Sequence, residues 1–218
     1  MGFVIAVDGP AASGKGTIAE TLGRRYGLPV LDSGLLYRAV GVLLQRAGGD
    51  PDDPAAAEAT ARSLDARSLD DPAFRTRAAG EAASRVAVHP GVRLALRDFQ
   101  QAFAAQEPGA VIDGRDIGTV IAPEAPAKLY VTASPQVRAG RRWKQLSGQG
   151  ESVAEADILA DILLRDERDA ARADSPMRPA ADAALLDTTE MTIDEAADAA
   201  RRIVEEARAR WESRKGRP

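Results

Sequence analysis

The sequence predicts an α/β fold in which a five-stranded parallel sheet carries helices on both faces. Two observations lead to this prediction. Five short apolar segments recur along the 218 residues, at 3–8, 29–32, 110–113, 127–133 and 184–187, and the stretches between them place apolar residues at helical spacing. Strands that are buried on both faces of a parallel sheet have this short, apolar character. Such sheets bind ligands at the carboxyl ends of their strands, so the residues after each apolar segment are the first candidates for a site.

The composition excludes several classes of function. With 44% hydrophobic and 28% charged residues the chain is typical of a globular protein, and we expect one domain over residues 1–218. A net charge of −4 and an aromatic content of 4% argue against a nucleic-acid-binding surface. The absence of cysteine excludes disulfides and thiolate metal sites, and no apolar run approaches the roughly 18 residues of a membrane span. We therefore expect a cytoplasmic protein without nucleic-acid or membrane partners.

The first apolar segment leads directly into a glycine-rich loop, GPAASGKGT, and then into a segment of helical spacing. In a strand-loop-helix unit of this kind, backbone N–H groups and the helix N-terminus converge on an anion, which predicts a phosphate-binding loop. Gly9 and Gly14 permit the tight backbone path, and Lys15 supplies a point charge for the β and γ phosphates of a nucleotide. The residues of this loop, which the family resemblance described below assigns to ATP binding, are Gly9, Pro10, Ala11, Ala12, Ser13, Gly14, Lys15, Gly16 and Thr17.

The residue after the lysine departs from the common form of this loop. Many NTPases carry a hydroxyl there that binds Mg²⁺, whereas this chain has Gly16 and places the hydroxyl on Thr17. Two accounts remain open: Thr17 contacts phosphate or a metal-bound water, or the site holds no metal. A switch GTPase is disfavoured because the chain contains no asparagine for an N-K-x-D guanine-binding motif.

The second apolar segment is followed by the sequence DSGLLYR. Ser33 and Tyr37 are four residues apart and share a helix face, with Arg38 adjoining, so a hydroxyl, a phenol and a cation are expected to meet one phosphate group. The alternative for Ser33 is a purely structural role as the helix N-cap.

Residues 50–108 differ from the rest of the chain. Strand signals vanish and prolines at positions 51, 54, 72 and 90 divide short helices, so we interpret this part as a helical insertion. The single histidine, His89, precedes Pro90 and is expected at a helix start. One histidine also argues against a Ser-His-Asp triad or a histidine-based metal site.

The third apolar segment ends in a group of charges, Asp113, Arg115 and Asp116. Asp113 is a candidate carboxylate near a metal-bound water, or else a turn residue at the end of the strand. After Ser134 and Pro135, which predict a helix start, the stretch 147–152 is expected to break the chain as a mobile loop.

A long helix is predicted from about residue 153 to residue 173. It places Arg165, Asp169 and Arg172 on one face, and from their spacing alone we expect a solvated, salt-bridged face. Arg141 and Arg142, on the preceding helix, are likewise expected to be solvated. The last helix begins with a capping box of Thr192 and Glu195. Its expected apolar stripe is Ile193, Ala197, Ala200, Val204, Ala207 and Trp211.

Five ordered stretches resemble one family of nucleoside monophosphate kinases, the bacterial cytidylate (CMP) kinases. They are IAVDGPAASGKGT, LDSGLLYR, DGRDIGTV, RDERDAAR and PAADAALLDTT, and the resemblance runs from about residue 3 to about residue 200. It implies a P-loop kinase fold with a monophosphate-binding insertion at about 33–108 and a mobile lid at about 140–172. Many family members have a strand-rich hairpin in the insertion, whereas SLDARSLDDPAFR passes here almost directly from one helix to the next.

The resemblance also implies an activity. ATP, bound with Mg²⁺, would give its γ-phosphoryl group to CMP or dCMP, and the protein is expected to be a monomer. Thr17 and Asp113 are the candidates for contact with the metal through water, and no direct protein ligand is predicted. The alternatives are another P-loop small-molecule kinase, acting on AMP, UMP or a shikimate-type acceptor, and a non-catalytic nucleotide-binding regulator.

Residue roles carry over from the family by motif. Lys15, Arg115 and Arg172 are expected to be catalytic, and Arg38 joins the two arginines on the CMP phosphate. Arg165 and Asp169 would bind the sugar, while Ser84, Arg93 and Asp116 would bind the cytosine. The full predicted CMP-binding set is Ser33, Tyr37, Arg38, Ser84, Arg93, Arg115, Asp116, Arg165, Asp169 and Arg172.

Overall fold

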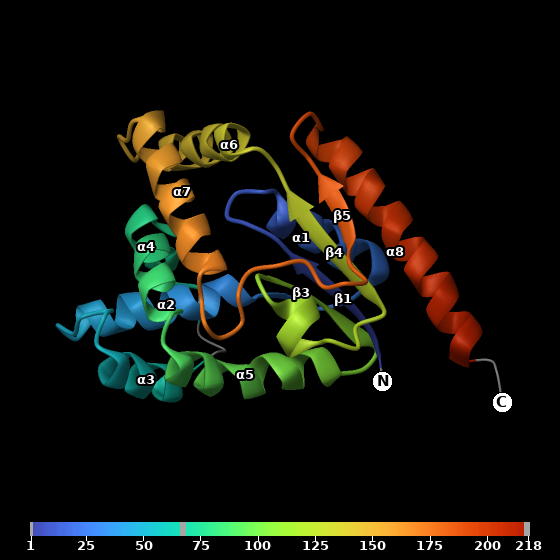
Figure 1. Cartoon of the computed structure of the whole chain (residues 1–218), viewed down its shortest axis with the longest axis horizontal. Helices are drawn as coiled ribbons and strands as arrows, with labels where there is room; N and C mark the ends of the chain where they lie inside the picture. Colours follow the sequence, from blue (N-terminus) through green and yellow to red (C-terminus); the bar gives the residue numbers. More distant parts are fainter. Residues whose placement is uncertain (1, 66–68, 216–218) are drawn as a thin grey trace.

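The computed structural model describes residues 2–65 and 69–215, and its centre is a five-stranded sheet (Figure 1). All strand pairs are parallel, and the strand order is β2-β3-β1-β4-β5. The predicted fold class and all five predicted strands are therefore confirmed. The strands are β1 (Phe3–Asp8), β2 (Val30–Asp32), β3 (Gly109–Gly114), β4 (Ala127–Thr132) and β5 (Ala184–Asp187).

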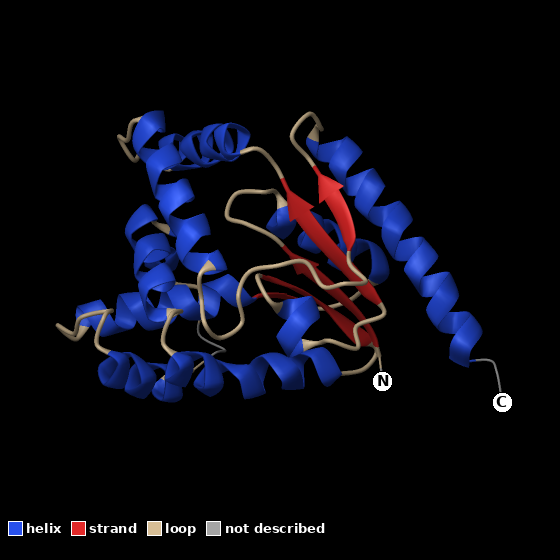
Figure 2. Cartoon of the chain, viewed as in Figure 1, coloured by secondary structure: helices blue, strands red, loops and turns tan. Residues whose placement is uncertain are grey.

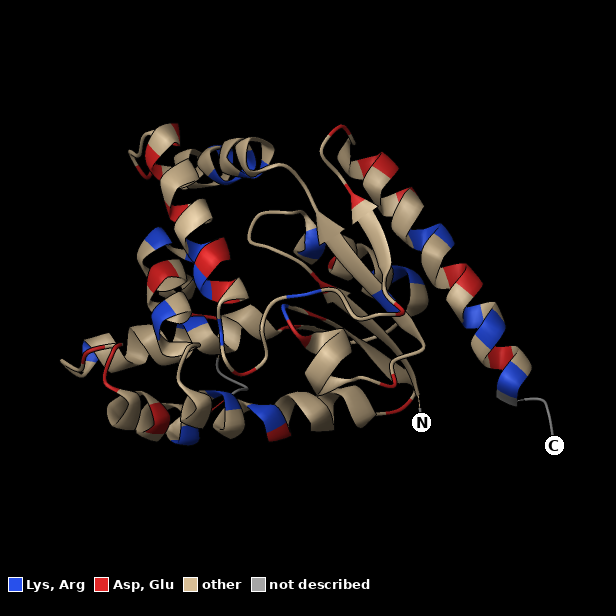
Figure 3. Ribbon diagram, in the orientation of Figure 1, with Lys and Arg blue, Asp and Glu red and all other residues tan. Residues whose placement is uncertain are grey.

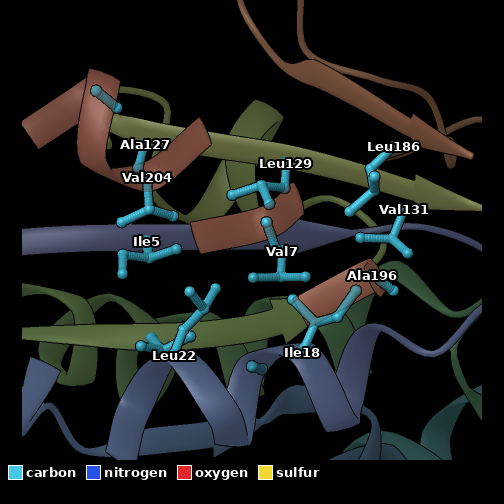
Figure 4. Packing of buried hydrophobic residues seen from close by; sticks show 14 of the residues in the cluster. Ile5, Val7, Ile18, Leu22, Ala127, Leu129, Val131, Leu186, Ala196 and Val204 are labelled. Carbon is cyan, nitrogen blue, oxygen red and sulfur yellow. The ribbon is translucent and has the colours of Figure 1, made fainter. Parts of the chain in front are cut away.

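Helices cover both faces of the sheet because side chains from successive strand residues point to opposite faces. On one face, Ile5 and Val7 of β1 pack against Ile18 and Leu22 of α1 (Lys15–Tyr26) and against Val204 of α8 (Ile193–Lys215), as Figure 4 shows. On the other face, the alternate residues of β1 and β3 pack against α5 (Pro90–Ala105) and the single-turn helix η2 (Ile117–Ile121).

The remaining helices lie beyond the carboxyl ends of the strands (Figure 2). The first group is α2 (Ser33–Arg46), α3 (Pro54–Ser63), the short η1 (Pro72–Arg75) and α4 (Arg77–Val86), and the second group is α6 (Pro135–Gly148) and α7 (Glu155–Ala170). The described residues of the predicted insertion contain no strand, and residues 66–68 of the SLDARSLDDPAFR stretch lie outside the described residues. No helix in the described part of the chain combines the length and hydrophobicity needed to cross a membrane.

Several helix ends follow the predicted chemistry and one does not. His89 is the N-cap residue of α5 with Pro90 behind it, and Thr192 and Glu195 form the predicted capping box, with the Glu195 N–H donating to Thr192 Oγ1 at 3.2 Å. The N-cap of α2, however, is Asp32 and not Ser33: Asp32 Oδ1 accepts the N–H of Leu35 at 3.2 Å. A carboxylate one residue earlier has taken the capping role.

The predicted stripe on α8 is wrong in its first turn. Ile193 is 71% exposed, and Ala196 rather than Ala197 is buried in the core cluster with Ala200 and Val204. The buried residues Ala196, Ala200, Val204 and Ala207 recur every three or four positions, so the helical period is as predicted, but the stripe begins at Ala196 and not at Ile193. A loop separates two helices where the sequence predicted one at 147–152. It spans residues 149–154, because α6 ends at Gly148 and α7 begins at Glu155.

Candidate active site

The loop after β1 follows a backbone path that requires glycine at two positions. Gly9 has a φ of 147° and Gly14 a φ of 92°, values that residues with a Cβ rarely adopt. A Cβ on Gly9 would lie 1.9 Å from the carbonyl oxygen of Val131 in β4, so the loop is pressed against the carboxyl end of the sheet. Helix α1 starts at Lys15, and the unpaired N–H groups of its first turn favour a bound anion.

A cleft of about 220 Å³ lies between this loop and helices α2, α4 and α7. We call it the central cleft; its polar lining includes Lys15, Asp32, Arg38, Arg115 and Arg165. Burial and the nearby Arg115 lower the pKa of Lys15 to about 7, and the same two causes lower the pKa of Arg165 to about 9. These like charges repel one another, and a phosphate dianion in the cleft would relieve that repulsion.

Two carboxylates lie at the strand ends beside the loop. Asp32 and Asp113 are opposite each other in the register of β2 and β3. Burial, and then repulsion from Asp32, raises the pKa of Asp113 to about 7. A Cβ on Gly16 would lie 3.9 Å from Asp113 Oδ2, so this carboxylate faces the residue after Lys15. The described residues contain no group of three or more His, Cys, Asp or Glu side chains placed to hold a metal ion.

A network of buried ion pairs adjoins the central cleft. We call it the buried charge cluster and define it as Arg93, Arg115, Asp116, Asp169 and Arg172. Arg93 donates to Asp116, and Arg172 donates to Asp169. Arg115 Nε also donates to Asp169, at 3.0 Å. Although burial opposes it, the attraction of the surrounding arginines lowers the pKa of Asp169 below its ordinary value. The cluster therefore joins α5, the end of β3 and the end of α7.

The cluster corrects the expectation of a solvated face on α7. Asp169 has no exposed surface, and Arg165 is 18% and Arg172 6% exposed along their side chains. Charges at helical spacing look the same in the sequence whether they face water or the interior. The decisive partner, Arg115, is 54 residues away in the chain, so spacing alone could not find it.

Polar atoms without partners mark this region as one that is prepared for a ligand. Ser84 Oγ and the Nε atoms of Arg93, Arg165 and Arg172 are buried, and no hydrogen-bond partner for them occurs among the described residues. Buried polar atoms in proteins are nearly always hydrogen-bonded. All four atoms belong to predicted CMP-binding residues, and a bound polar ligand would provide the missing hydrogen-bond partners.

The structure places Ser33, Tyr37 and Arg38, the three residues predicted to meet one phosphate group, in different surroundings. Arg38 faces the central cleft and donates to the carbonyl oxygens of Phe74 and Thr76. The Tyr37 ring instead lies against Arg93, whose guanidinium carbon is 5.8 Å from the ring centroid. Ser33 is 4% exposed and lies against Gly114. Ser33 and Tyr37, four residues apart, lie on one side of α2, whereas Arg38, the residue after Tyr37, is rotated by about 100° and faces the central cleft.

A second cleft, of about 560 Å³, lies over the outer side of the loop, and we call it the outer cleft. It is lined by Ser13, Gly14, Lys15, Gly16, Thr17, Arg141, Arg142, Lys144, Thr188 and Thr192, among others. Arg141 and Arg142 are therefore not the solvated residues that the sequence suggested. Arg141 donates to Thr188 Oγ1 at 2.9 Å and to Ser13 O at 3.4 Å, and Arg142 reaches Thr76 O at 3.4 Å.

Thr188 is a site residue that sequence reasoning missed. It is 1% exposed, and its hydroxyl donates to Ser13 O at 3.0 Å, which ties the end of β5 to the phosphate loop. The available signal was its position directly after the last apolar segment, at the same edge of the sheet as the loop.

Comparisons with known proteins agree with this geometry. Residues 5–206 match the family model described as cytidylate kinase. A protein from Caulobacter sp. (strain K31) named cytidylate kinase is 71% identical over 99% of this chain and 100% of its own length. Proteins with the same name from Caulobacter vibrioides (strain NA1000 / CB15N) and Xanthobacter autotrophicus are 73% and 60% identical over 96% and 95% of the chain, and over 99% of their own lengths.

Similar solved structures support the fold. An uncharacterized protein from Eubacterium ventriosum has a TM-score of 0.57 at 16% identity and covers 94% of this chain and 99% of its own. A sugar kinase from Janibacter sp. has a TM-score of 0.51 at 14% identity, over 94% and 95% of the two chains. With a family match over most of its length and relatives above 70% identity, the chain belongs to the cytidylate kinase family.

Proposed function

We propose that this protein transfers the γ-phosphoryl group of ATP to CMP or dCMP, giving ADP and CDP or dCDP. The observation that carries the proposal is the buried charge cluster, which lies beside a cleft lined by Lys15 of the phosphate loop and holds buried polar atoms without hydrogen-bond partners among the described residues. Membership of the cytidylate kinase family supports the same reaction.

The outer cleft is the proposed site for ATP. Its lining includes residues of the predicted ATP-binding set from Ala12 to Thr17, and Arg141 lies over the loop with a guanidinium nitrogen 4.0 Å from a Cβ placed on Gly14. The loop's N–H groups and Lys15 would hold the phosphates at the point where the outer and central clefts meet, since Lys15 lines both.

The central cleft and the buried charge cluster are the proposed site for the monophosphate. Arg38 and Arg115 line the cleft and would bind the phosphate, together with Arg172 from the cluster. Arg165 and Asp169 would bind the sugar. Ser84, Arg93 and Asp116 would bind the base, because cytosine presents an amino donor beside two acceptors.

Tyr37 and Ser33 take more distant roles in this proposal. Tyr37 supports Arg93 through its ring, and Ser33 packs against Gly114 at the end of β3. Neither is placed in the lining of the central cleft.

The chemistry requires positioning and charge stabilisation more than proton transfer. A nucleotide phosphate has a second pKa near 6, so the attacking oxygen is already mostly ionised at neutral pH and no general base is needed. Lys15, Arg115 and Arg172 would hold two anions in line and offset the charge that develops in a loose transition state. Bound phosphates would in turn restore the protonated form of Lys15, whose pKa is lowered in the free protein.

Mg²⁺ is the proposed cofactor, bound with ATP. The residues beside the loop fit it, because Asp32, Asp113 and Thr17 offer the oxygen donors that this ion prefers, and the ion usually keeps several of its waters. Thr17 and Asp113 would hold those waters. The bound ion would supply additional positive charge to the phosphates.

We also propose that residues 33–108 and 140–172 act as the monophosphate-binding insertion and the lid. Two ion pairs join them in this structure: Arg77 Nε to Asp161 Oδ2 at 2.6 Å and Arg168 Nη1 to Glu81 Oε1 at 3.0 Å, both between α4 and α7. Both helices carry acidic and basic residues (Figure 3). A cytoplasmic location and a monomeric state stay predictions from the sequence.

The test is ADP release at fixed Mg-ATP with CMP, dCMP, UMP, AMP and shikimate as separate acceptors. We expect release with CMP and dCMP at rates at least tenfold above those with the other acceptors. Preference for AMP, UMP or shikimate would assign the protein to another small-molecule kinase. Tight ATP binding without ADP release for any acceptor would instead indicate a nucleotide-binding regulator.

A further inference from the structure

Asp8 is a buried carboxylate to which the proposed reaction gives no role. It is the last residue of β1, directly before Gly9 of the phosphate loop, and it is 4% exposed. Its side chain turns away from that loop: Oδ1 accepts the N–H of Ile117 at 2.8 Å, and Oδ2 accepts the N–H of Gly118 at 2.7 Å. Both donors belong to η2, which begins directly after Asp116.

The backbone of Asp116 is thereby held from two sides. Its carbonyl oxygen accepts the N–H of Val120 at 2.8 Å and the N–H of Ile121 at 3.3 Å, which fastens it to η2. At the N-terminal end of η2, Asp8 accepts the N–H groups of Ile117 and Gly118, the two residues that follow Asp116. The side chain of Asp116 is then directed at Arg93, with which it is paired. Asp8 is the link between this turn and the central strand of the sheet.

Asp8 differs from the exposed capping carboxylate Asp53 in being buried. Burial raises the pKa of Asp8 to about 6, so the charge is held at a cost. An uncharged Asn has the same shape but accepts with only one of its two terminal atoms, and its amide would face a backbone N–H group. Only a carboxylate accepts both N–H groups at once.

We propose that Asp8 is a positioning residue for acceptor selectivity: its side chain anchors the Ile117–Gly118 turn and so fixes Asp116 against the base of the monophosphate. The inference rests on the proposed function, in which Asp116 binds cytosine. In this proposal β1 positions both binding sites. The phosphate loop continues directly from its last residue, Asp8, and the Asp8 side chain binds the turn that carries Asp116.

Two substitutions disturb this anchor from opposite sides. Asp8→Asn removes one acceptor. Gly118→Ala keeps the carboxylate but adds a methyl group 3.3 Å from Asp8 Oδ2 and 3.3 Å from Lys128 Cδ, so the Asp8 contact with the turn must shift by a few tenths of an ångström unless Lys128 alone yields. For each purified variant, kcat and KM are measured for CMP, UMP and ATP. Asp53→Asn is the control for an Asp-to-Asn change elsewhere, because Asp53 Oδ1 alone accepts two backbone N–H groups, at 2.9 and 3.1 Å, on the exposed N-terminus of α3, and an amide oxygen can keep both bonds.

We expect Asp8→Asn to reduce the preference for CMP over UMP, as the ratio of kcat/KM values, by about tenfold, with the KM for ATP changed less than about twofold. Gly118→Ala should act in the same direction with a smaller change, and it carries the test if Asp8→Asn does not fold. Asp53→Asn should leave the preference unaltered.

An unchanged CMP preference in both variants would overturn the inference, as would an equal loss for CMP, UMP and ATP, which indicates general damage. Asp116→Asn is measured in parallel. If Asp116→Asn itself leaves the preference unchanged, the proposed base contact fails. If Asp116→Asn lowers the preference and the Asp8 and Gly118 variants do not, only the present inference is contradicted.

Discussion

The outer cleft and the buried charge cluster recognise their proposed ligands with different parts of the chain. The outer cleft is lined by one continuous part of the loop, Ala12 to Thr17, whose backbone N–H groups and single lysine are the proposed phosphate ligands. The buried charge cluster is made of side chains from three separate elements, and Arg115 and Asp169 meet across 54 residues of sequence. The loop's binding groups are therefore neighbours in the sequence, whereas the groups of the buried charge cluster come together only when the whole chain has folded.

The two regions also differ in what holds them. The loop keeps its shape because glycine at positions 9 and 14 allows the path and because the end of the sheet presses against it. The cluster keeps its shape through mutual charge pairing, in which removal of one member leaves the others buried and uncompensated. Mutations should consequently reduce turnover without unfolding in the first region, and reduce stability together with acceptor binding in the second.

The largest expected effect is on turnover at the loop. Lys15→Ala removes the charge proposed to hold the β and γ phosphates, and we expect kcat to fall about 10³-fold, equivalent to about 4 kcal/mol. The midpoint of urea unfolding should stay nearly unchanged, because the hydrogen bond that the Lys15 side chain makes within the described residues is long, 3.5 Å to Pro10 O. Arg24→Ala, on the exposed side of α1, is the control. Near-normal turnover in Lys15→Ala would contradict the role of the loop.

A stability effect of similar size is expected in the cluster. Asp169→Ala leaves Arg115 and Arg172 buried without their carboxylate, which should lower the free energy of unfolding by about 4 kcal/mol. Urea denaturation measures this directly, and ATP binding below the transition should persist because the loop lies elsewhere. A decrease of less than about 1 kcal/mol in the free energy of unfolding would contradict a stabilising role for the ion pairs of Asp169.

The next effect concerns pH. Burial raises the pKa of Asp8 from 3.8 to about 6, with repulsion from Asp116 adding to it, while the two N–H groups and Arg115 oppose it. Between pH 4 and 6 the folded protein therefore binds more protons at Asp8 than the unfolded chain, and stability falls as pH rises through this window. The difference in unfolding free energy between the wild type and Asp8→Asn should decline by about 2 kcal/mol from pH 4 to pH 6.5.

That difference should be flat above pH 7, where Asp8 is ionised in both states. If the difference in unfolding free energy instead rises between pH 4 and 6, folding favours the ionised form of Asp8, and burial does not raise its pKa.

A smaller effect is expected at the edge of the outer cleft. Arg141 contacts Thr188 and Ser13 O over the loop, so Arg141→Ala should raise the KM for ATP about tenfold and leave the KM for CMP within about twofold. Steady-state kinetics with each substrate varied in turn separates the two constants. An equal rise in both would indicate that the outer cleft does not serve ATP alone.

The same contrast explains what the sequence could predict. The strand-loop-helix around Lys15, the sheet and the helical insertion follow from local pattern, because strand periodicity and glycine conformations act over a few residues. The burial of Asp169 does not, since it depends on Arg115 from another element. Arg141 and Thr188 were missed because an arginine on an amphipathic helix and a threonine after a strand have ordinary surface counterparts.

The resemblance to a known family supplied roles that spacing could not. It identified Arg165, Asp169 and Arg172 as site residues against the expectation of a solvated helix face, and their burial agrees with that identification. It did not supply the directions of Ser33 and Tyr37, which depend on how α2 is rotated against the sheet.

The central claim is that Asp116, held in the buried charge cluster, selects cytosine while the loop binds ATP independently. The direct measurement is the ratio of kcat/KM for CMP to that for UMP in Asp116→Asn, with the KM for ATP determined in the same preparations. An amide at this position can donate to the uracil oxygen where the carboxylate cannot, so we predict a fall of the ratio by about tenfold to a hundredfold with the KM for ATP unchanged. An unaltered ratio in a folded, ATP-binding variant would contradict the account.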